Sequence, residues 1–230
     1  MRHPLLVCLL LAGSVPLGTP NRATAVDKGA TKDKPWPAAL KVTVDTTEVP
    51  ERADWAKKAK KLVEKWHPII SDLLKSDGFT PPGDVKLVFK KDMEGVAYTS
   101  RTTIVIAADW IKEHPDDYGM VVHELTHVIQ NYRHPGPSWL IEGIADYVRF
   151  YHYEPKTKLT IERRRPSYRD GYRTTAMFLA WIEKSHDKNI VRKLNESLRK
   201  AKYKDELFQT YTSKTVDELW KSFVASRHAK

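Results

Sequence analysis

The chain has 230 residues and a formal net charge of +10, from 39 Lys and Arg against 29 Asp and Glu. This length is enough for one domain with a substantial core and a short leader. The charge raises the affinity for anionic surfaces without selecting one, and the sequence contains no nucleic-acid-binding motif, glycine-rich phosphate loop or internal repeat.

Residues 1–25 predict a secretory signal peptide. A short basic start precedes the apolar run Leu5 to Leu11, and Ala23-Thr24-Ala25 supplies the small residues of a cleavage site. The apolar run is too short to span a membrane, which disfavours an uncleaved anchor. We therefore expect the protein to be secreted, to the extracellular space or the periplasm.

Removal of this leader changes the charge and the cysteine content of the chain. Arg2 and Arg22 are its only Lys or Arg residues and it has no acid, so the charge of +10 falls by two to +8. Cys8 is the only cysteine and lies within the leader, so the remaining chain has no disulfide to stabilise it. Residues 26–39 are charged and contain prolines, which predicts a linker before a domain at 40–230.

The first half of this domain predicts a sheet with a backing helix. Ala53 to Leu74 has apolar residues at helical spacing, although Pro68 is expected to kink or break the helix. Alternating or apolar runs predict four short strands, at Leu40–Thr46, Val85–Phe89, Gly95–Tyr98 and Thr103–Ala107.

The strand at Gly95–Tyr98 is a candidate for substrate binding. An exposed edge strand can bind a peptide by main-chain pairing, and glycine lets another backbone approach closely. The four residues predicted to bind substrate are Gly95, Val96, Ala97 and Tyr98. The same pattern also fits an ordinary edge hairpin.

The next helix carries His123-Glu124-Leu125-Thr126-His127. Its two histidines are four residues apart, so both side chains leave one face of the helix and can bind one metal ion. Glu124 lies beside the first ligand, where a carboxylate can deprotonate a water molecule. The Pro115-Asp116-Asp117 segment predicts the helix start, since acidic side chains suit exposed N–H groups.

A second helix is predicted at Trp139–Tyr147, after a loop rich in proline and glycine. Glu142 and Asp146 lie four residues apart on one face of this helix. Glu142 can complete the metal site, and Asp146 can accept a hydrogen bond from the other ring nitrogen of a metal-bound histidine. The order of these motifs resembles the gluzincin peptidases, whose zinc site consists of two histidines and a glutamate.

The rest of the chain predicts helices. They begin at Gly171-Tyr172, at Ile190 and at Thr215, where Thr215 and Glu218 form a capping box. The basic run at 163–165 is typical of a solvated loop, with the rim of a cleft as the alternative. Strands come first and helices follow, so the fold class is α+β.

Several stretches together resemble the basic secretory protein family, secreted proteins of plants and microbes with zinc-peptidase motifs. They are Asp92–Tyr98, His123–Gln130, Pro137–Arg149, Gly171–Leu179, Leu194–Glu196 and Thr215–Trp220. The resemblance implies a zincin-like fold, with a small N-terminal mixed sheet and backing helix, the His-Glu-x-x-His active-site helix and a helical C-terminal part. It also implies peptidase activity on peptides or proteins.

Two residues compete to be the third metal ligand. The metzincin pattern requires a histidine six residues after the second metal histidine, but this position is Arg133, and His134 comes one residue later. His134 precedes Pro135-Gly136-Pro137 and is expected to be exposed. Glu142 lies among apolar residues, where a carboxylate is costly to bury unless it is paired or bound to metal. We therefore expect His123, His127 and Glu142 to bind zinc.

These residues predict a secreted zinc metallopeptidase. Glu124 acts as general base and later returns a proton to the leaving amine. Tyr172 is the candidate for a second donor to the oxyanion, and Tyr168 is the reserve. The sequence fits equally well a Tyr172 that packs in the core with its hydroxyl bonded to the main chain.

Two other functions remain possible from the sequence. One is a catalytically weak or inactive zincin-fold protein that binds at the cell surface or wall. The other is a basic binder of cell wall or nucleic acid, whose binding weakens steeply with salt and survives chelation. We expect no specific nucleic-acid partner, a possible anionic surface or cell wall, and a monomer.

Overall fold

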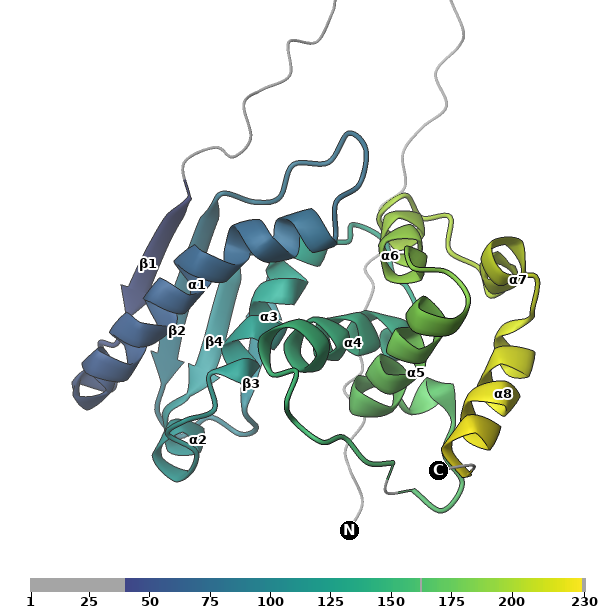
Figure 1. The fold of residues 1–230 in the computed structure, drawn as a ribbon. Coiled ribbons are helices and arrows are strands. Elements are labelled where there is room, and N and C mark those ends of the chain that lie inside the picture. The colour runs from purple at the N-terminus through teal and green to yellow at the C-terminus, as the bar shows by residue number, and fades with distance from the viewer. Residues whose placement is uncertain (1–39, 162, 229–230) are drawn as a thin grey trace, which may run out of the picture. The chain divides into compact units, whose positions relative to one another are not determined.

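Four strands form a mixed sheet in the computed structural model, which describes residues 40–161 and 163–228. Their order is β1 (Lys41–Asp45), β2 (Asp84–Lys90), β4 (Thr103–Ala107) and β3 (Ala97–Ser100). β1, β2 and β4 are parallel, whereas β3 pairs antiparallel with β4 and forms an edge (Figure 1). The predicted signal peptide and the linker at 26–39 lie outside the described residues.

The two long helices of the first half, α1 (Ala53–Leu73) and α3 (Gly119–Gln130), pack against this sheet and each other. α1 buries one stripe at helical spacing, which includes Ala56, Ala59, Val63 and Ile70. The predicted break at Pro68 is wrong, because α1 continues past it to Leu73.

A short helix, α2 (Ala108–Glu113), directly follows β4 in the first half of the chain. The α-helices of the C-terminal part are α4 (Ser138–Tyr147), α5 (Tyr172–Ser185), α6 (Ile190–Arg199), α7 (Glu206–Thr212) and α8 (Val216–His228). In Figure 1, α3 and α4 lie between the sheet and the group α5 to α8. The predicted α+β class, with a mixed N-terminal sheet and a helical C-terminal part, is confirmed.

The predicted helix start at Thr215 is also confirmed. The side chain of Thr215 accepts the N–H of Glu218 at 3.3 Å, and the carboxylate of Glu218 accepts the N–H of Thr215 at 2.8 Å. This is the predicted capping box at the start of α8. Within residues 40–161 and 163–228, no helix is long and apolar enough to cross a membrane.

α4, which carries two of the predicted site residues, packs closely on α5. A Cβ placed on Gly143 would lie 2.2 Å from Cγ2 of Thr175 in α5, so glycine is required for this approach. Gly143 therefore serves the packing of α4 on α5. α4 continues into a π-helical segment, Val148–Tyr153, which the sequence did not predict.

Arg199 of α6 connects the ends of the two helices on the sheet. Its guanidinium donates to the carbonyl oxygens of Ile129, in the last turn of α3, and of Leu74, at the end of α1, each at 3.1 Å. These carbonyls lack helical partners, so the arginine satisfies both ends. The C-terminal part thereby fixes the end of α3.

Candidate metal centre and active-site cleft

α3 holds two histidines on one buried face. The helix begins beside Asp117, whose Oδ1 accepts the N–H of Met120 at 3.2 Å, and ends at Asn131 in the left-handed conformation. Between these ends the helix is buried, and only 7% of the surface of His123 is exposed. A rigid, buried helix fixes the spacing of both imidazole rings.

Three side-chain atoms from α3 and α4 converge on one point. Nε2 of His123 lies 3.1 Å from Nε2 of His127 and 3.2 Å from Oε2 of Glu142. The remaining edge, from Nε2 of His127 to the same carboxylate oxygen, is 3.4 Å. His123, His127 and Glu142 therefore form a triangle of potential ligand atoms.

This triangle fits a tetrahedral metal ion. Bonds of about 2.0–2.1 Å to nitrogen and oxygen, at tetrahedral angles, place neighbouring ligand atoms roughly 3.3–3.4 Å apart. The three observed edges are close to this length. Two histidines and one carboxylate are also a donor set that zinc takes in hydrolytic sites, leaving a fourth position open.

The other nitrogen of each ring has its own acceptor. Nδ1 of His123 lies 2.7 Å from Oδ1 of Asp146, and Nδ1 of His127 lies 2.7 Å from Oε1 of Gln130. The amide orientation of Gln130 follows from its Nε2, which donates to the carbonyl of Ile141 at 3.0 Å. With a proton on each Nδ1, both Nε2 atoms present a lone pair to the centre of the triangle.

Without a cation, this cluster attracts a proton. Burial lowers the pKa of His123, but hydrogen bonds to Asp146 and Glu142 outweigh it and raise the pKa to about 9. Burial raises the pKa of Glu142, but hydrogen bonds from His123 and His127 outweigh it and lower the pKa to about 2. The pocket therefore stabilises positive charge at its centre, which a bound metal ion would supply instead of the proton.

Glu124, between the two histidines in sequence, is held by the edge strand. The hydroxyl of Thr99 in β3 lies 2.7 Å from Oε2 of Glu124 and 2.9 Å from its main-chain oxygen. In β3, Thr99 pairs with Ile104, a fully buried residue, so strand alternation directs Thr99 toward α3. Sequence reasoning missed Thr99 and also Gln130, although Gln130 is three residues after His127 and so on the same helical face.

The two candidate tyrosines have different positions. Tyr172, at the start of α5, stacks near His123 with the rings 6.1 Å apart and 14° from parallel, and it is 55% exposed. Tyr168 is buried, and its hydroxyl donates to Asp217 at 3.1 Å. Tyr172 therefore faces the metal centre, whereas the hydroxyl of Tyr168, the reserve, is engaged with α8.

The metal centre opens into a cleft of about 1150 Å³. Of the residues predicted to bind substrate, Val96, Ala97 and Tyr98 line this cleft, whereas Gly95 does not. β3 begins at Ala97, two residues later than predicted, because Gly95 has φ +88° and forms a turn before the strand. His134 is exposed at the rim and is not part of the ligand triangle.

A family described as peptidases of plants and bacteria matches residues 52–223, about three quarters of the chain. The chain belongs to this family. The matched region contains β3 and both helices of the candidate metal centre, α3 and α4, and membership agrees with the expected resemblance. Comparison with curated proteins found no match, and neither did comparison with solved structures.

Proposed function

We propose that the protein is a secreted zinc-dependent peptidase that hydrolyses peptide bonds with Glu124 as general base. The observation that carries the proposal is the convergence of three free ligand atoms. Asp146 and Gln130 occupy the outer nitrogens of His123 and His127. Among the residues that the structure describes, the inner lone pairs and Glu142 therefore have no protein partner except one another. Family membership supports the peptidase class.

His123, His127 and Glu142 would hold the ion. When bound, a zinc ion polarises a water molecule and the substrate carbonyl, acting as a Lewis acid. Glu124 then takes the proton of the attacking water and delivers a proton to the leaving amine. Thr99 supports this role, because its hydroxyl is within hydrogen-bond distance of Oε2 and leaves the other carboxylate oxygen available.

Substrate would bind along the open edge of β3. The main-chain oxygen of Val96 accepts the N–H of Ala107, which directs the polar groups of residue 96 toward β4. The directions of the main-chain N–H and C=O groups alternate from residue to residue in an antiparallel pair. The main-chain groups of Tyr98 therefore point toward β4, and those of Ala97 and Thr99 point toward the open edge. The main chain of these two residues is where we place pairing with an extended peptide.

Tyr172 is proposed as the second donor to the oxyanion. Its ring lies against His123, and its hydroxyl makes no hydrogen bond within the part of the chain that the structure describes. Burial and the nearby carboxylates of Glu142 and Asp146 raise the pKa of this hydroxyl, which keeps its proton available for donation.

Secretion is proposed from the sequence of residues 1–25, and zinc from the donor set. The test is digestion of a broad peptide library by purified protein, before chelation, after chelation and after zinc is restored. The proposal predicts cleavage that chelation abolishes and zinc recovers. A reconstituted protein that contains zinc and cleaves no peptide would instead support an inactive binding protein.

A further inference from the structure

The cleft around the metal centre carries several basic side chains that differ in how their charge is compensated. Arg149 and Arg163 both line the cleft and both have carboxylate partners. Arg149 bonds Asp117 at 2.7 Å and Glu154 at 3.1 Å, and Arg163 bonds Asp170 at 3.0 Å. The positive charges of Arg149 and Arg163 are therefore compensated by carboxylates of the protein itself.

Three other basic residues of the cleft have no such partner. Arg101, Lys158 and Arg173 line it and are exposed, and within residues 40–161 and 163–228 none of them forms an ion pair or side-chain hydrogen bond. The acids of the cleft are already engaged, by Thr99, by the two histidines or by Arg163. Outside the metal centre, the cleft thus has an excess of uncompensated positive charge.

Arg173 is the best placed of the three. Its guanidinium lies 5.2 Å from the ring centroid of Phe150, and that of Arg149 lies 4.8 Å from the same ring. Two guanidinium groups share one ring, but only Arg149 is neutralised by acids. The ring holds the guanidinium of Arg173 by a cation–π contact, while the N–H donors of that group stay available.

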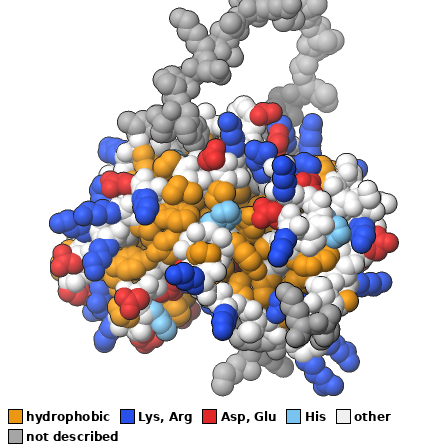
Figure 2. All heavy atoms as spheres, in the orientation of Figure 1, with side chains coloured by type: hydrophobic (Ala, Val, Ile, Leu, Met, Phe, Trp, Pro, Cys, Tyr) orange, Lys and Arg blue, Asp and Glu red, His pale blue; other side chains and the backbone are white. Residues whose placement is uncertain are grey.

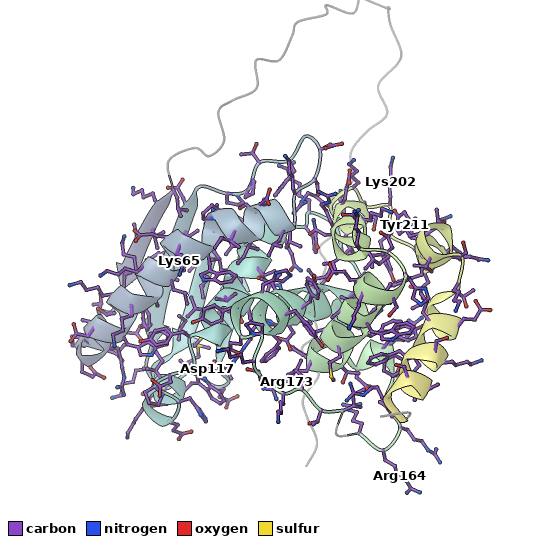
Figure 3. All side chains as sticks on the ribbon, in the orientation of Figure 1. Lys65, Asp117, Arg164, Arg173, Lys202 and Tyr211 are labelled. Carbon is purple, nitrogen blue, oxygen red and sulfur yellow. The ribbon has the colours of Figure 1, made fainter. Side chains whose placement is uncertain are left out.

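Arg173 lines the same cleft as the residues of the candidate metal centre. It follows Tyr172, whose ring stacks on His123, and it belongs to the first turn of α5, where a basic side chain is unfavourable for the helix dipole. Figure 3 labels Arg173 at the start of α5 and Asp117 in the loop before α3, on the same side of the molecule. A residue kept against its local preference beside a reactive centre indicates a functional constraint.

We infer that Arg173 selects substrates that carry a carboxylate close to the scissile bond, with Arg101 and Lys158 adding a general attraction for acidic peptides. This inference rests on the proposed peptidase function, which it deepens by naming a substrate class. The guanidinium forms a two-pronged, charge-assisted pair with a carboxylate, which the matching amide cannot form. The carboxylate belongs either to an Asp or Glu side chain or to the C-terminus of the peptide.

The basic side chains elsewhere do not explain such a preference. Figure 2 shows Lys and Arg scattered over the displayed face, both at its edge and among the hydrophobic side chains of its middle. Scattered exposed charges attract any anion weakly and are screened by salt. Selection at one position of a peptide requires a fixed cation, which the contact with Phe150 supplies.

Binding to zinc-loaded Glu124→Gln protein tests the inference without turnover. Short fluorescent peptides carry Glu or Gln at one position, moved along the sequence, and have a free or an amidated C-terminus. We expect Glu or the free terminus to bind about tenfold more tightly at one position, as expected for a charge-assisted hydrogen bond. Tighter binding that depends on the position of Glu indicates a side-chain carboxylate. Tighter binding that requires the free C-terminus indicates the terminal carboxylate.

The matched variants are Arg173→Gln and Lys65→Gln, each in the Glu124→Gln background. Lys65 is exposed on α1 and lies outside the cleft, and its substitution by glutamine removes the same unit of charge as Arg173→Gln. The preference should fall below about twofold in the first variant and persist in the second. Arg173→Lys, which keeps the charge but not the planar fork, should give an intermediate preference.

Absence of any preference, or a preference that survives Arg173→Gln, would overturn the inference. Cleavage of the library by wild-type protein, measured in parallel, separates this failure from failure of the proposed function. Cleavage without acidic preference refutes the role of Arg173 alone. Selective binding by a zinc-loaded protein that cleaves nothing contradicts the peptidase proposal and leaves the anion-selective cleft standing.

Discussion

Thr99 donates to Glu124 across the gap between the edge strand and the active-site helix, with 2.7 Å between its hydroxyl and Oε2. In the proposed mechanism the same strand also pairs with substrate at its open edge, so one element would position both the peptide and the proposed base. A hydroxyl in this position limits the rotation of the carboxylate and stabilises its charged form.

Thr99→Val should therefore lower kcat about tenfold, or ~1.4 kcal/mol in activation free energy, with little change in melting temperature. Valine keeps the shape and the β-branching and removes only the hydroxyl. Thr99→Ser should recover most of the rate, because it restores the hydroxyl that bonds Oε2 of Glu124. If serine fails to rescue while zinc content is normal, the residue acts through packing of the strand.

The third ligand is tested by Glu142→Ala and His134→Ala. Glu142 is part of the ligand triangle, and His134 is exposed at the rim. We expect Glu142→Ala to lose zinc affinity and thermal stability together, since metal binding contributes to the free energy of folding. His134→Ala should change neither. Full zinc in Glu142→Ala with depleted zinc in His134→Ala would contradict the assignment, and metal analysis of both purified variants decides it.

Tyr172→Phe separates a catalytic hydroxyl from a packing residue. The ring of Tyr172 is more than half exposed, so its hydroxyl contributes little to folding. We expect kcat to fall by roughly tenfold to a thousandfold while melting temperature and zinc content stay unchanged. A structural role would appear as lower stability and lower zinc content, with the remaining activity proportional to folded protein.

His67 should make stability depend on pH. It is buried, its Nε2 lies 2.8 Å from the carbonyl of Pro82, and burial lowers its pKa below the usual 6.5. The folded protein therefore keeps His67 neutral while the unfolded chain takes up a proton. The contribution of His67 to the free energy of unfolding is fully present above pH 6.5 and is lost as the pH falls below it. The loss cannot exceed about 1.4 kcal/mol per pH unit for one proton.

His67→Gln provides the comparison, because all other groups titrate alike in both proteins. Unfolding free energies of the metal-free proteins between pH 7.5 and pH 5 should converge as pH falls. Parallel curves for wild type and variant would show that His67 is not held neutral in the folded protein.

The local order of the fold was predictable from the sequence, and the reasons are physical. The spacing of His123 and His127 and of Glu142 and Asp146 places each pair on one helical face, whatever the rest of the chain does. Thr215 and Glu218 indicate the start of a helix because their hydrogen bonds join residues only three positions apart. Such signals depend only on neighbours in the chain.

Tertiary contacts were harder to predict. Thr99 reaches Glu124 from 25 residues away, and a threonine in a strand has no feature that names its partner. The close approach of Gly143 to Thr175 of α5 is another such contact, because the direction in which α4 packs depends on the whole C-terminal part. A glycine can serve a strand that another backbone approaches closely, or it can form a turn with positive φ. Gly95 takes the second role, so β3 starts later than predicted.

The most direct test of the proposed mechanism is Glu124→Gln compared with wild-type protein in one peptide-library digest, with zinc measured in both. Glutamine keeps the size of the side chain and can still bond Thr99, but it cannot accept the proton of the attacking water. The account predicts equal zinc content, an unchanged fold and a turnover lower by about 10²–10⁴. Equal turnover in the two proteins would contradict it.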